Sequence, residues 1–246
     1  MEQNEYIKME HFEKFYWWHK GKLFMVNELL NKYLSKKKGK LKILEIGCGT
    51  GKTLSTLSTW GEVYGIDISK EAVNFCKSKG FKNVELADIN EMDIKKYEGK
   101  FDLIVTLDVL EHIQDDVETL KRIYKMLKKG GLVLINVPAY KFLWSEHDEA
   151  LHHKRRYHSL ELTQKVKDSG FTIIKKSHFV FTTFFPIALF KFLSNFFKKT
   201  AYPTDSYIML PKPVNEILSK ILYLEANLIK NISLPLGTTI CLIAKK

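Results

Sequence analysis

The sequence predicts an α/β fold in which a mostly parallel sheet is covered by helices on both faces. Three observations support this prediction. Strand-like and helix-like segments alternate through the middle of the chain, several strand-like segments are wholly apolar, and the first of them runs directly into glycines. A wholly apolar strand has to be buried on both faces, which is the position of a strand between two helical layers.

The strand-like segments are short and rich in branched or aromatic residues. They cover residues 41–46, 62–68, 83–89, 101–110, 132–137, 171–181 and 238–246. Helical patterns lie between them at residues 69–79, 115–131 and 159–170. Ser69 and Ser159 are the expected N-caps, and Gly130 and Gly170 the expected stops.

The length of 246 residues fits one α/β domain with additions. We divide this single domain into an aromatic helical cap (1–35), an α/β core (36–180) that holds the motifs described below, a hydrophobic insertion (181–235) and a closing strand (236–246). No internal repeat interrupts this plan.

The composition excludes several classes of protein. An apolar content of 45% with 27% charged residues argues against a disordered or fibrous chain. The net charge of +11 favours an anionic partner, such as nucleic acid, a membrane surface or a phosphorylated substrate. The alternative is that the excess lysines only cover a solvated protein surface. Three cysteines without a CxxC pair argue against a disulfide framework or a cysteine-based zinc site and favour a reducing compartment. No signal-peptide pattern opens the chain, so we expect a cytoplasmic protein.

The glycine-rich turn after the first strand is the sharpest motif. Glu45 precedes Gly47, Gly49 and Gly51 in a GxGxG pattern that allows a tight turn and a close approach of the backbone to a ligand. A Walker loop is excluded because its first glycine would have to stand where the chain has isoleucine. A dinucleotide fingerprint is excluded because its third glycine would have to replace Lys52.

Two aspartates follow at the ends of the next strands. Asp67 lies 20 residues after Gly47, the spacing at which a carboxylate accepts from both hydroxyls of a ribose. Asp88 could accept from an adenine amino group while Ile89 packs on the ring. Each aspartate alone is typical of a residue that caps a helix. Their combination with the glycine turn favours a nucleoside-binding site.

These segments together resemble the class I S-adenosylmethionine-dependent methyltransferases. The resemblance rests on residues 44–51, 65–69, 87–89, 107–115 and 127–138, and the Leu-Glu-His form of the fourth motif resembles the quinone and small-molecule O-methyltransferases. It implies a Rossmann-like sheet of seven strands with an antiparallel last strand, S-adenosylmethionine as cofactor and S-adenosylhomocysteine as product. The implied cofactor-binding residues are Glu45, Gly47, Cys48, Gly49, Gly51, Asp67, Ile68, Asp88, Ile89, Asp108 and Val109.

The N-terminal aromatic run resembles the cap of a branch associated with cell-envelope glycans and glycolipids. We expect Tyr16, Trp17 and Trp18 to line the acceptor site, with plain core packing as the alternative. The family element continues to an arginine where this chain has Lys20 and Lys22, so a guanidinium clamp on the cofactor carboxylate is not expected.

The loop 138–162 follows the fifth strand and therefore reaches the crevice at the carboxyl ends of the strands. Its HKRRY element resembles the same glycan-associated branch, and we expect Arg155, Arg156 and Tyr157 to bind the acceptor. The alternative is an arginine–tyrosine corner that ties the loop down. Two imidazoles and a carboxylate of this loop could gather into a metal site, which is a further alternative. Their spacing matches no defined ligand set, so we expect no metal.

We expect methyl transfer to a hydroxyl of a sugar, glycolipid or other small molecule. A hydroxyl acceptor gains from a general base, and the candidates are His153, His147 and His112, in that order. An RNA methyltransferase is the alternative enzyme, because the chain is basic, although nucleic acid is not the expected partner. A non-catalytic module that binds S-adenosylmethionine is the alternative from another class.

Residues 187–199 form a predicted helix with a wide aromatic face and lysines at its margins. Such a face suits an acceptor-pocket wall, a homodimer contact or peripheral contact with the inner face of a membrane. A spanning or re-entrant helix is a further alternative. Basic residues at 154–156, 175–176 and 198–199 flank this side of the expected site. Their placement favours a phosphate-bearing or lipid-linked acceptor.

Overall fold

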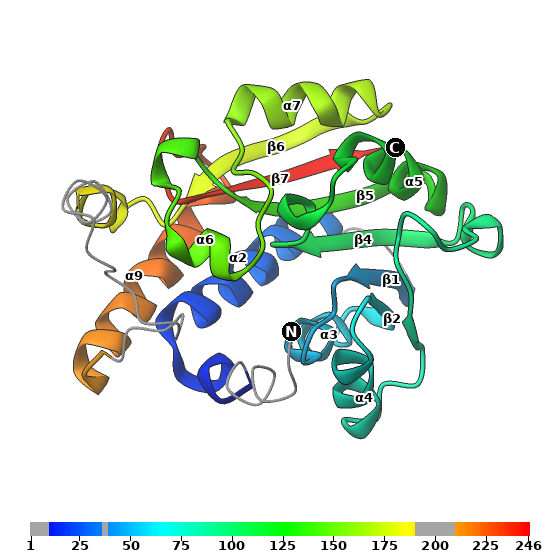
Figure 1. Ribbon diagram of the computed structural model, residues 1–246, viewed down its shortest axis with the longest axis horizontal. Helices are drawn as coiled ribbons and strands as arrows, with labels where there is room; N and C mark the ends of the chain where they lie inside the picture. Colours follow the sequence, from blue (N-terminus) through cyan, green and yellow to red (C-terminus); the bar gives the residue numbers. More distant parts are fainter. Residues whose placement is uncertain (1–9, 36–38, 190–209) are drawn as a thin grey trace.

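The computed structural model describes residues 10–35, 39–189 and 210–246 (Figure 1). Seven strands form one sheet in the order β3-β2-β1-β4-β5-β7-β6. Their bounds are β1 Leu41–Ile46, β2 Gly61–Asp67, β3 Val84–Leu86, β4 Phe101–Leu107, β5 Leu127–Pro138, β6 Thr172–Phe179 and β7 Thr239–Lys245. Only β7 runs antiparallel to its neighbours β5 and β6, and the predicted fold class is confirmed.

Helices cover both faces of this sheet. They are α2 Trp17–Leu34, α3 Lys52–Leu57, α4 Lys70–Ser78, α5 Asp116–Met126, α6 Glu146–Ala150, α7 Ser159–Asp168 and α9 Lys212–Ile229, with 3-10 turns η1 Lys95–Tyr97, η2 Leu110–His112 and η3 Lys141–Leu143. One buried cluster joins α5 and α7 to the sheet, and a second joins α2 and α9 to the opposite face. The sheet is therefore buried on both sides, as its apolar strands require.

The N-terminal cap and the segment before the last strand pack against each other. Helices α2 and α9 lie side by side (Figure 1), and Gly21 makes this close approach feasible. A Cβ at Gly21 would lie 2.2 Å from Cδ1 of Leu222 on α9. The backbone N–H of Trp17 donates to Oδ1 of Asn215 at 2.9 Å, which fixes the start of α2 on α9.

The structure corrects three expected boundaries. The helix over 115–131 ends at Met126, because Leu127 is already extended and the following Lys-Lys-Gly-Gly run belongs to β5. The N-cap of α7 is His158 rather than Ser159. Strand β3 ends at Leu86, so Asp88 lies two residues beyond the strand.

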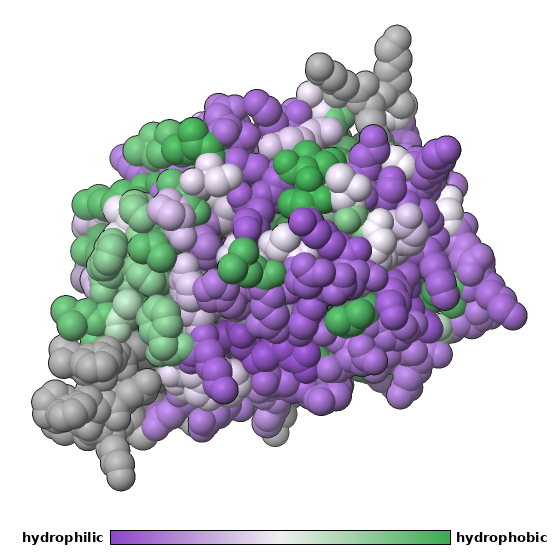
Figure 2. All heavy atoms as spheres, turned by 90° about the horizontal axis from the view of Figure 1, so that it is seen from above, coloured by the Kyte–Doolittle hydropathy of each residue, from purple (hydrophilic) through white to green (hydrophobic). Residues whose placement is uncertain are grey.

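The apolar insertion is described only in part. Most of the predicted helix over 187–199 lies outside the described residues. Figure 2 shows apolar side chains gathered at the end of the molecule where Figure 1 places α9. Within residues 10–35, 39–189 and 210–246, no helix is both long and apolar enough to cross a membrane.

Candidate cofactor and acceptor site

The glycine turn between β1 and α3 has the backbone shape that its sequence predicts. Gly47, Gly49 and Gly51 have φ values of 73°, 50° and 78°, in the left-handed region where glycine is favoured. A Cβ at Gly47 would lie 2.4 Å from Cγ2 of Val109. The turn therefore presents backbone atoms to the space above the sheet and packs directly against the turn after β4.

Two carboxylates flank this turn. Glu45 is buried, burial raises its pKa well above the usual value, and its Oε2 has no hydrogen-bond partner. Asp67 accepts from the backbone N–H groups of Gly49 and Ser69, each at 2.9 Å, and burial raises its pKa as well. A carboxylate has about four acceptor positions, so Asp67 keeps acceptor capacity that a ribose hydroxyl could use. Glu45, Asp67 and the backbone of the glycine turn together fit the polar groups of S-adenosylmethionine.

The side chains expected around the adenine divide into two groups. Asp88 accepts from the backbone of Asn90 at 2.8 Å and is half-buried, while Ile68 is 76% exposed at the end of β2. Ile89 is buried in the core, so the expectation that it packs on the adenine ring is wrong in this structure. Leu86, exposed at the end of β3, pairs with Asp67 across the two strands and is an apolar residue that the sequence pattern missed.

Cys48 lies in the turn, but its side chain points away from the ligand space. It is buried, and its Sγ lies 3.7 Å from the Sγ of Cys76. The hydrogen bond with Cys76 and burial raise the pKa of Cys48. Only its backbone can contact a cofactor, which corrects any expectation of a side-chain role.

The turn after β4 is held by residues from distant parts of the chain. Asp108 has a φ of 57°, accepts from Nζ of Lys22 at 2.9 Å and accepts from Nδ2 of Asn136 at 2.8 Å. The Lys22 ammonium also lies 4.3 Å from the centroid of the Trp18 ring. Sequence reasoning missed the roles of Lys22 and Asn136, which are separated from Asp108 along the chain but meet it at one edge of the sheet.

The N-terminal cap closes over the glycine turn. Glu13 accepts a hydrogen bond from Thr50, and burial raises the pKa of Glu13. Lys79 pairs with Glu10 at 3.1 Å and donates to the carbonyl oxygen of Thr50 at 2.9 Å. These contacts place the cap beside the cofactor turn.

The three predicted aromatic residues of the cap have different surroundings. Trp17 is buried between α2 and α9, so core packing is its role and the expected acceptor contact is wrong. Tyr16 and Trp18 are half-buried, and Trp18 lies against Lys22 next to the Asp108 turn. Trp18 is therefore the predicted aromatic residue placed closest to the chemistry.

The histidine loop contributes one of the predicted bases to a compact cluster. The rings of His112 and His153 meet edge to face with centroids 4.7 Å apart. Glu111 joins them, and one ligand-type atom of each residue lies within 4.8 Å of those of the other two. Burial, followed by the neighbouring His153, lowers the pKa of His112 to about 4, so its imidazole is neutral near pH 7.

Asp148 organises the loop around this cluster, although the sequence pattern did not single out its role. Its Oδ1 lies 2.9 Å from Nδ1 of His153 and accepts from Nε of Arg156 at 2.7 Å. Arg156 also donates to the carbonyl oxygen of Ala139 at 3.1 Å. Arg156 is thus a positioning residue for Asp148. Its hydrogen bonds go to the protein itself, which does not agree with the expected contact between Arg156 and the acceptor.

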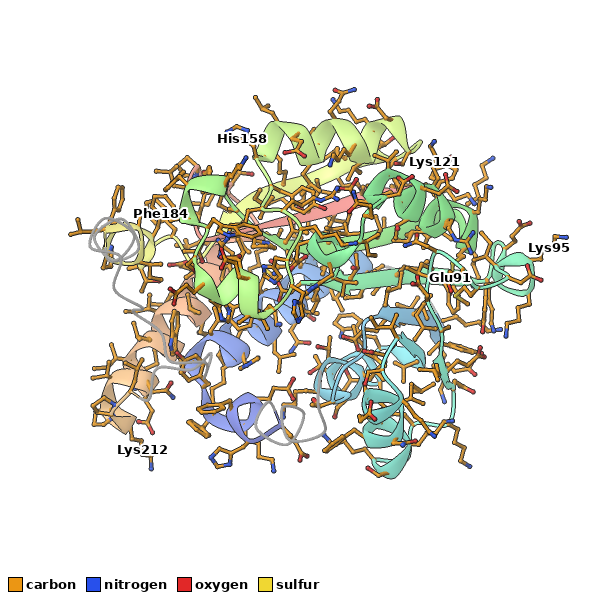
Figure 3. All side chains as sticks on the ribbon, viewed as in Figure 1. Glu91, Lys95, Lys121, His158, Phe184 and Lys212 are labelled. Atoms are coloured by element: carbon orange, nitrogen blue, oxygen red, sulfur yellow. The ribbon has the colours of Figure 1, made fainter. Side chains whose placement is uncertain are left out.

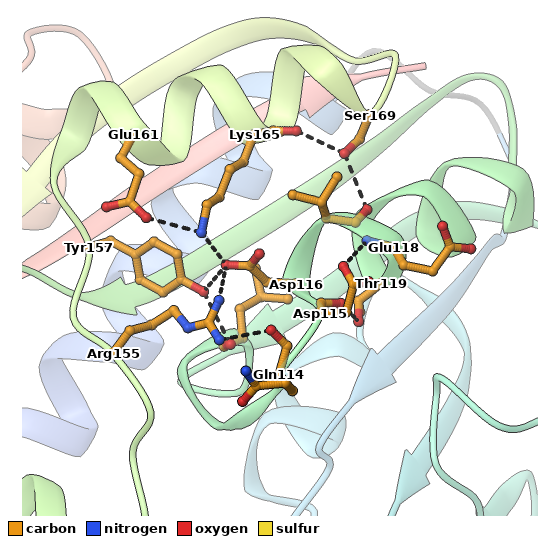
Figure 4. A network of polar contacts seen from close by, with 12 residues as sticks. Gln114, Asp115, Asp116, Glu118, Thr119, Arg155, Tyr157, Glu161, Lys165 and Ser169 are labelled. Atoms are coloured by element: carbon orange, nitrogen blue, oxygen red, sulfur yellow. Dashed lines mark hydrogen bonds and ion pairs between the residues drawn. The ribbon is translucent and has the colours of Figure 1, made fainter.

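The rest of the HKRRY element forms a corner (Figure 4). Tyr157 is fully buried, and its hydroxyl donates to Asp116 at 2.8 Å. Arg155 pairs with the same carboxylate at 3.1 Å and donates to the carbonyl oxygen of Gln114 at 2.8 Å, while Lys165 reaches Asp116 at 2.7 Å. The expectation that Tyr157 contacts an acceptor is therefore wrong, and the structure favours the arginine–tyrosine corner.

His147 lies on α6 and is not part of the cluster. An aromatic group lies further along the same side. The ring of Tyr140 stacks on His178 with centroids 5.3 Å apart and meets Phe184 at 5.8 Å, beside the segment that the structure does not describe. Figure 3 labels Phe184 there and His158 just before α7.

Comparison with known proteins agrees with this arrangement. Residues 17–176 match the family model described as a methyltransferase domain, and the chain therefore belongs to this methyltransferase family. The proteins that it resembles include S-adenosylmethionine-dependent methyltransferases. The glycine turn, Glu45 and Asp67 are the residues that would hold this cofactor, which supplies an activated methyl group when bound.

Individual relatives cover only parts of the chain. A ubiquinone biosynthesis O-methyltransferase of Pelagibacter ubique is 34% identical over 98 residues, which span 39% of this chain and 41% of the relative. Phosphoethanolamine N-methyltransferase 3 of Arabidopsis thaliana is 31% identical over 139 residues, or 53% of this chain and 28% of the relative. The chain thus matches less than half the length of either relative.

A solved methyltransferase supports the fold over the whole chain. The S-adenosylmethionine-dependent methyltransferase of Archaeoglobus fulgidus superposes with a TM-score of 0.61 at 21% identity, covering 97% of this chain and 99% of the other. At this identity the likeness concerns the fold alone.

Proposed function

We propose that this methyltransferase acts on a hydroxyl group of a sugar, a glycolipid or another small molecule. The observation that carries the proposal is the cluster of Glu111, His112 and His153 next to the Asp108 turn. A sulfonium methyl group is already activated, so the enzyme has to position the acceptor and remove its proton. An alcohol oxygen needs this proton removal, and the cluster provides groups that can take part in it.

The proposed transfer is a single displacement. The acceptor oxygen forms a bond to the methyl carbon, the carbon–sulfur bond breaks, and its electron pair stays on the sulfur of S-adenosylhomocysteine. The hydroxyl proton leaves the acceptor through the cluster. Positioning of the two reactants in line is the main contribution of the surrounding protein.

Among the three histidines proposed from the sequence, His153 has the strongest support. Asp148 fixes its Nδ1, which leaves Nε2 for chemistry and repeats the carboxylate–imidazole pairing that orients a base. His112 supports it as a neutral neighbour. His147 has the weakest support, since it lies outside the cluster.

The acceptor is proposed to be lipid-linked, with peripheral membrane contact at the inner face of the membrane. Exposed apolar side chains follow one face of α9 at positions 214, 217, 224 and 228, and Lys212 and Lys220 lie on the same helix. An apolar stripe with basic residues suits the interface of an anionic membrane. Homodimerisation through this face is the competing proposal.

An assay with labelled S-adenosylmethionine tests the function. Purified enzyme is incubated with hydroxylated acceptors, including glycolipids in vesicles and small polyols or phenols, and with phosphoethanolamine and RNA as comparison acceptors. Methylation of a hydroxyl supports the proposal. Methylation of only the amine or the RNA would replace it, and cofactor binding without any turnover would favour a non-catalytic module.

A further inference from the structure

We propose that Glu111, His112 and His153 form a binding site for one divalent transition-metal ion such as Zn²⁺. Their ligand-type atoms already lie within 4.8 Å of one another. Atoms bound at about 2.0–2.2 Å around a tetrahedral ion are roughly 3.4 Å apart, so small side-chain rotations would complete the site. Two imidazoles and one carboxylate with an open position are a known ligand set for catalytic zinc.

The state of Glu111 is the second observation that indicates a cation. Its side chain is fully buried, and neither carboxylate oxygen has a hydrogen-bond partner. A buried carboxylate without a hydrogen-bond partner is costly. The nearby cations are engaged elsewhere, because Lys22 pairs with Asp108 and Arg156 pairs with Asp148. A bound metal ion would give Glu111 the positive charge that it lacks.

Asp148 holds the imidazole of His153 in place. Its Oδ1 lies 2.9 Å from Nδ1 of His153, which leaves Nε2 as the ligand atom, and a carboxylate behind a histidine is the usual outer partner at a metal site. The backbone N–H of Lys154 donates to the carbonyl oxygen of Glu111 at 2.8 Å, so the two ligand segments are tied together.

The sequence shows no defined ligand spacing for such a site and predicts that no metal binds. Glu111 and His112 are adjacent in a 3-10 turn, whereas His153 follows on a separate loop. Only the fold brings them together. The proposal therefore replaces that expectation.

The role of the ion rests on the proposed function, whereas its binding does not. An ion with an open position could bind the acceptor oxygen and lower the pKa of its hydroxyl. The hydroxyl proton would then leave to water, and the acceptor oxygen would form its bond to the methyl carbon as the carbon–sulfur bond breaks. In this ion-bound form the three residues would act as metal ligands, so the ion would replace His153 as the group that promotes proton loss.

Metal binding is tested on the full chain after treatment with a chelator. Co²⁺ is titrated while its visible d–d absorption is recorded, and Zn²⁺ is titrated by calorimetry, both without cofactor. We expect one ion per chain. Glu111→Gln and His153→Ala should each weaken binding by at least about 100-fold, and Asp148→Asn by about 10–100-fold, the range for loss of an outer partner.

His158→Ala is the matched control, since His158 is an exposed histidine of the same loop that lies outside the cluster. It should bind Co²⁺ like the wild type. Each variant is also titrated with S-adenosylhomocysteine, and retained affinity shows that it is folded. The absence of 1:1 binding by the wild type, or unchanged binding by both folded ligand variants, would overturn the site.

Methyl transfer separates the two proposals. An enzyme that binds one ion but methylates no hydroxyl would uphold the site and refute the proposed function. Full hydroxyl methylation in chelator, with no ion bound, would uphold the function and overturn the role of the ion.

Discussion

The proposed cofactor side and the proposed acceptor side of this chain are built in different ways. The cofactor turn is contiguous, since Glu45 and three glycines lie within seven residues and act largely through the backbone. The acceptor side is assembled from side chains that are far apart in the sequence, such as Lys22 with Asp108 and Asp148 with His153. A local motif can be recognised in one stretch of sequence, whereas an assembled site exists only once the chain is folded.

The largest expected effect is on cofactor affinity and should follow from adding a side chain in the glycine turn. Gly47→Ala places a Cβ 2.4 Å from Val109 at a residue with a φ of 73°. We expect the affinity for S-adenosylhomocysteine to fall by at least about 100-fold, which corresponds to about 2.7 kcal/mol. Calorimetric titration measures the loss.

Gly99→Ala is the control for backbone strain. Gly99 also has a positive φ of 59°, but nothing lies within 4 Å of an added Cβ. This variant should bind S-adenosylhomocysteine normally. Equal losses in both variants would mean that strain, not the clash with Val109, weakens the site.

The next effect concerns the acceptor side. His153→Ala removes the imidazole that Asp148 holds, and we expect kcat for hydroxyl methylation to fall by about 10²-fold, the lower end of the range for loss of a general base. His158→Ala should leave kcat unchanged. Wild-type kcat in His153→Ala would show that the cluster plays no part in the reaction.

A smaller effect is expected where the cap meets the site. Lys22→Met removes the ammonium that pairs with Asp108 at 2.9 Å but keeps a chain of similar length. We expect about a tenfold loss of kcat/KM, equivalent to about 1.4 kcal/mol. The reason is that Asp108 loses one of the two side chains that donate hydrogen bonds to it. Lys20→Met on the same helix is the control, and identical steady-state kinetics of the two variants would contradict this role.

The smallest effect concerns stability and pH. Burial, followed by the charge of Lys22, lowers the pKa of His19 to about 3. Below about pH 6.5, His19 binds a proton in the unfolded chain but stays neutral in the folded chain. The contribution of His19 to the free energy of unfolding is therefore fully present above about pH 6.5 and is lost as the pH falls toward 3. The loss is about 1.4 kcal/mol per pH unit for this group.

Urea unfolding at pH 7, 6 and 5 measures this dependence. The free energy of unfolding of His19→Gln should fall less steeply than that of the wild type over this range. Parallel curves for the two proteins would mean that His19 is not held neutral in the fold.

Particular residues show how far the sequence could predict the structure. The sheet, its antiparallel strand and the positions of Gly47 and Asp67 follow from local pattern and spacing, and the structure agrees. Trp17 and Tyr157 were expected at the acceptor but are buried, because burial depends on which distant segment packs on a side chain. The contact of Asp148 with His153 could not be predicted for the same reason, because the two side chains meet only once the loop is folded.

The central claim is that the glycine turn binds the cofactor independently of the cluster that serves the acceptor. Titration of S-adenosylhomocysteine into the wild type, Gly47→Ala and His153→Ala tests it most directly. We expect His153→Ala to bind within about twofold of the wild type, or about 0.4 kcal/mol, while Gly47→Ala loses most of its affinity. Equal weakening of the two variants would contradict the claim.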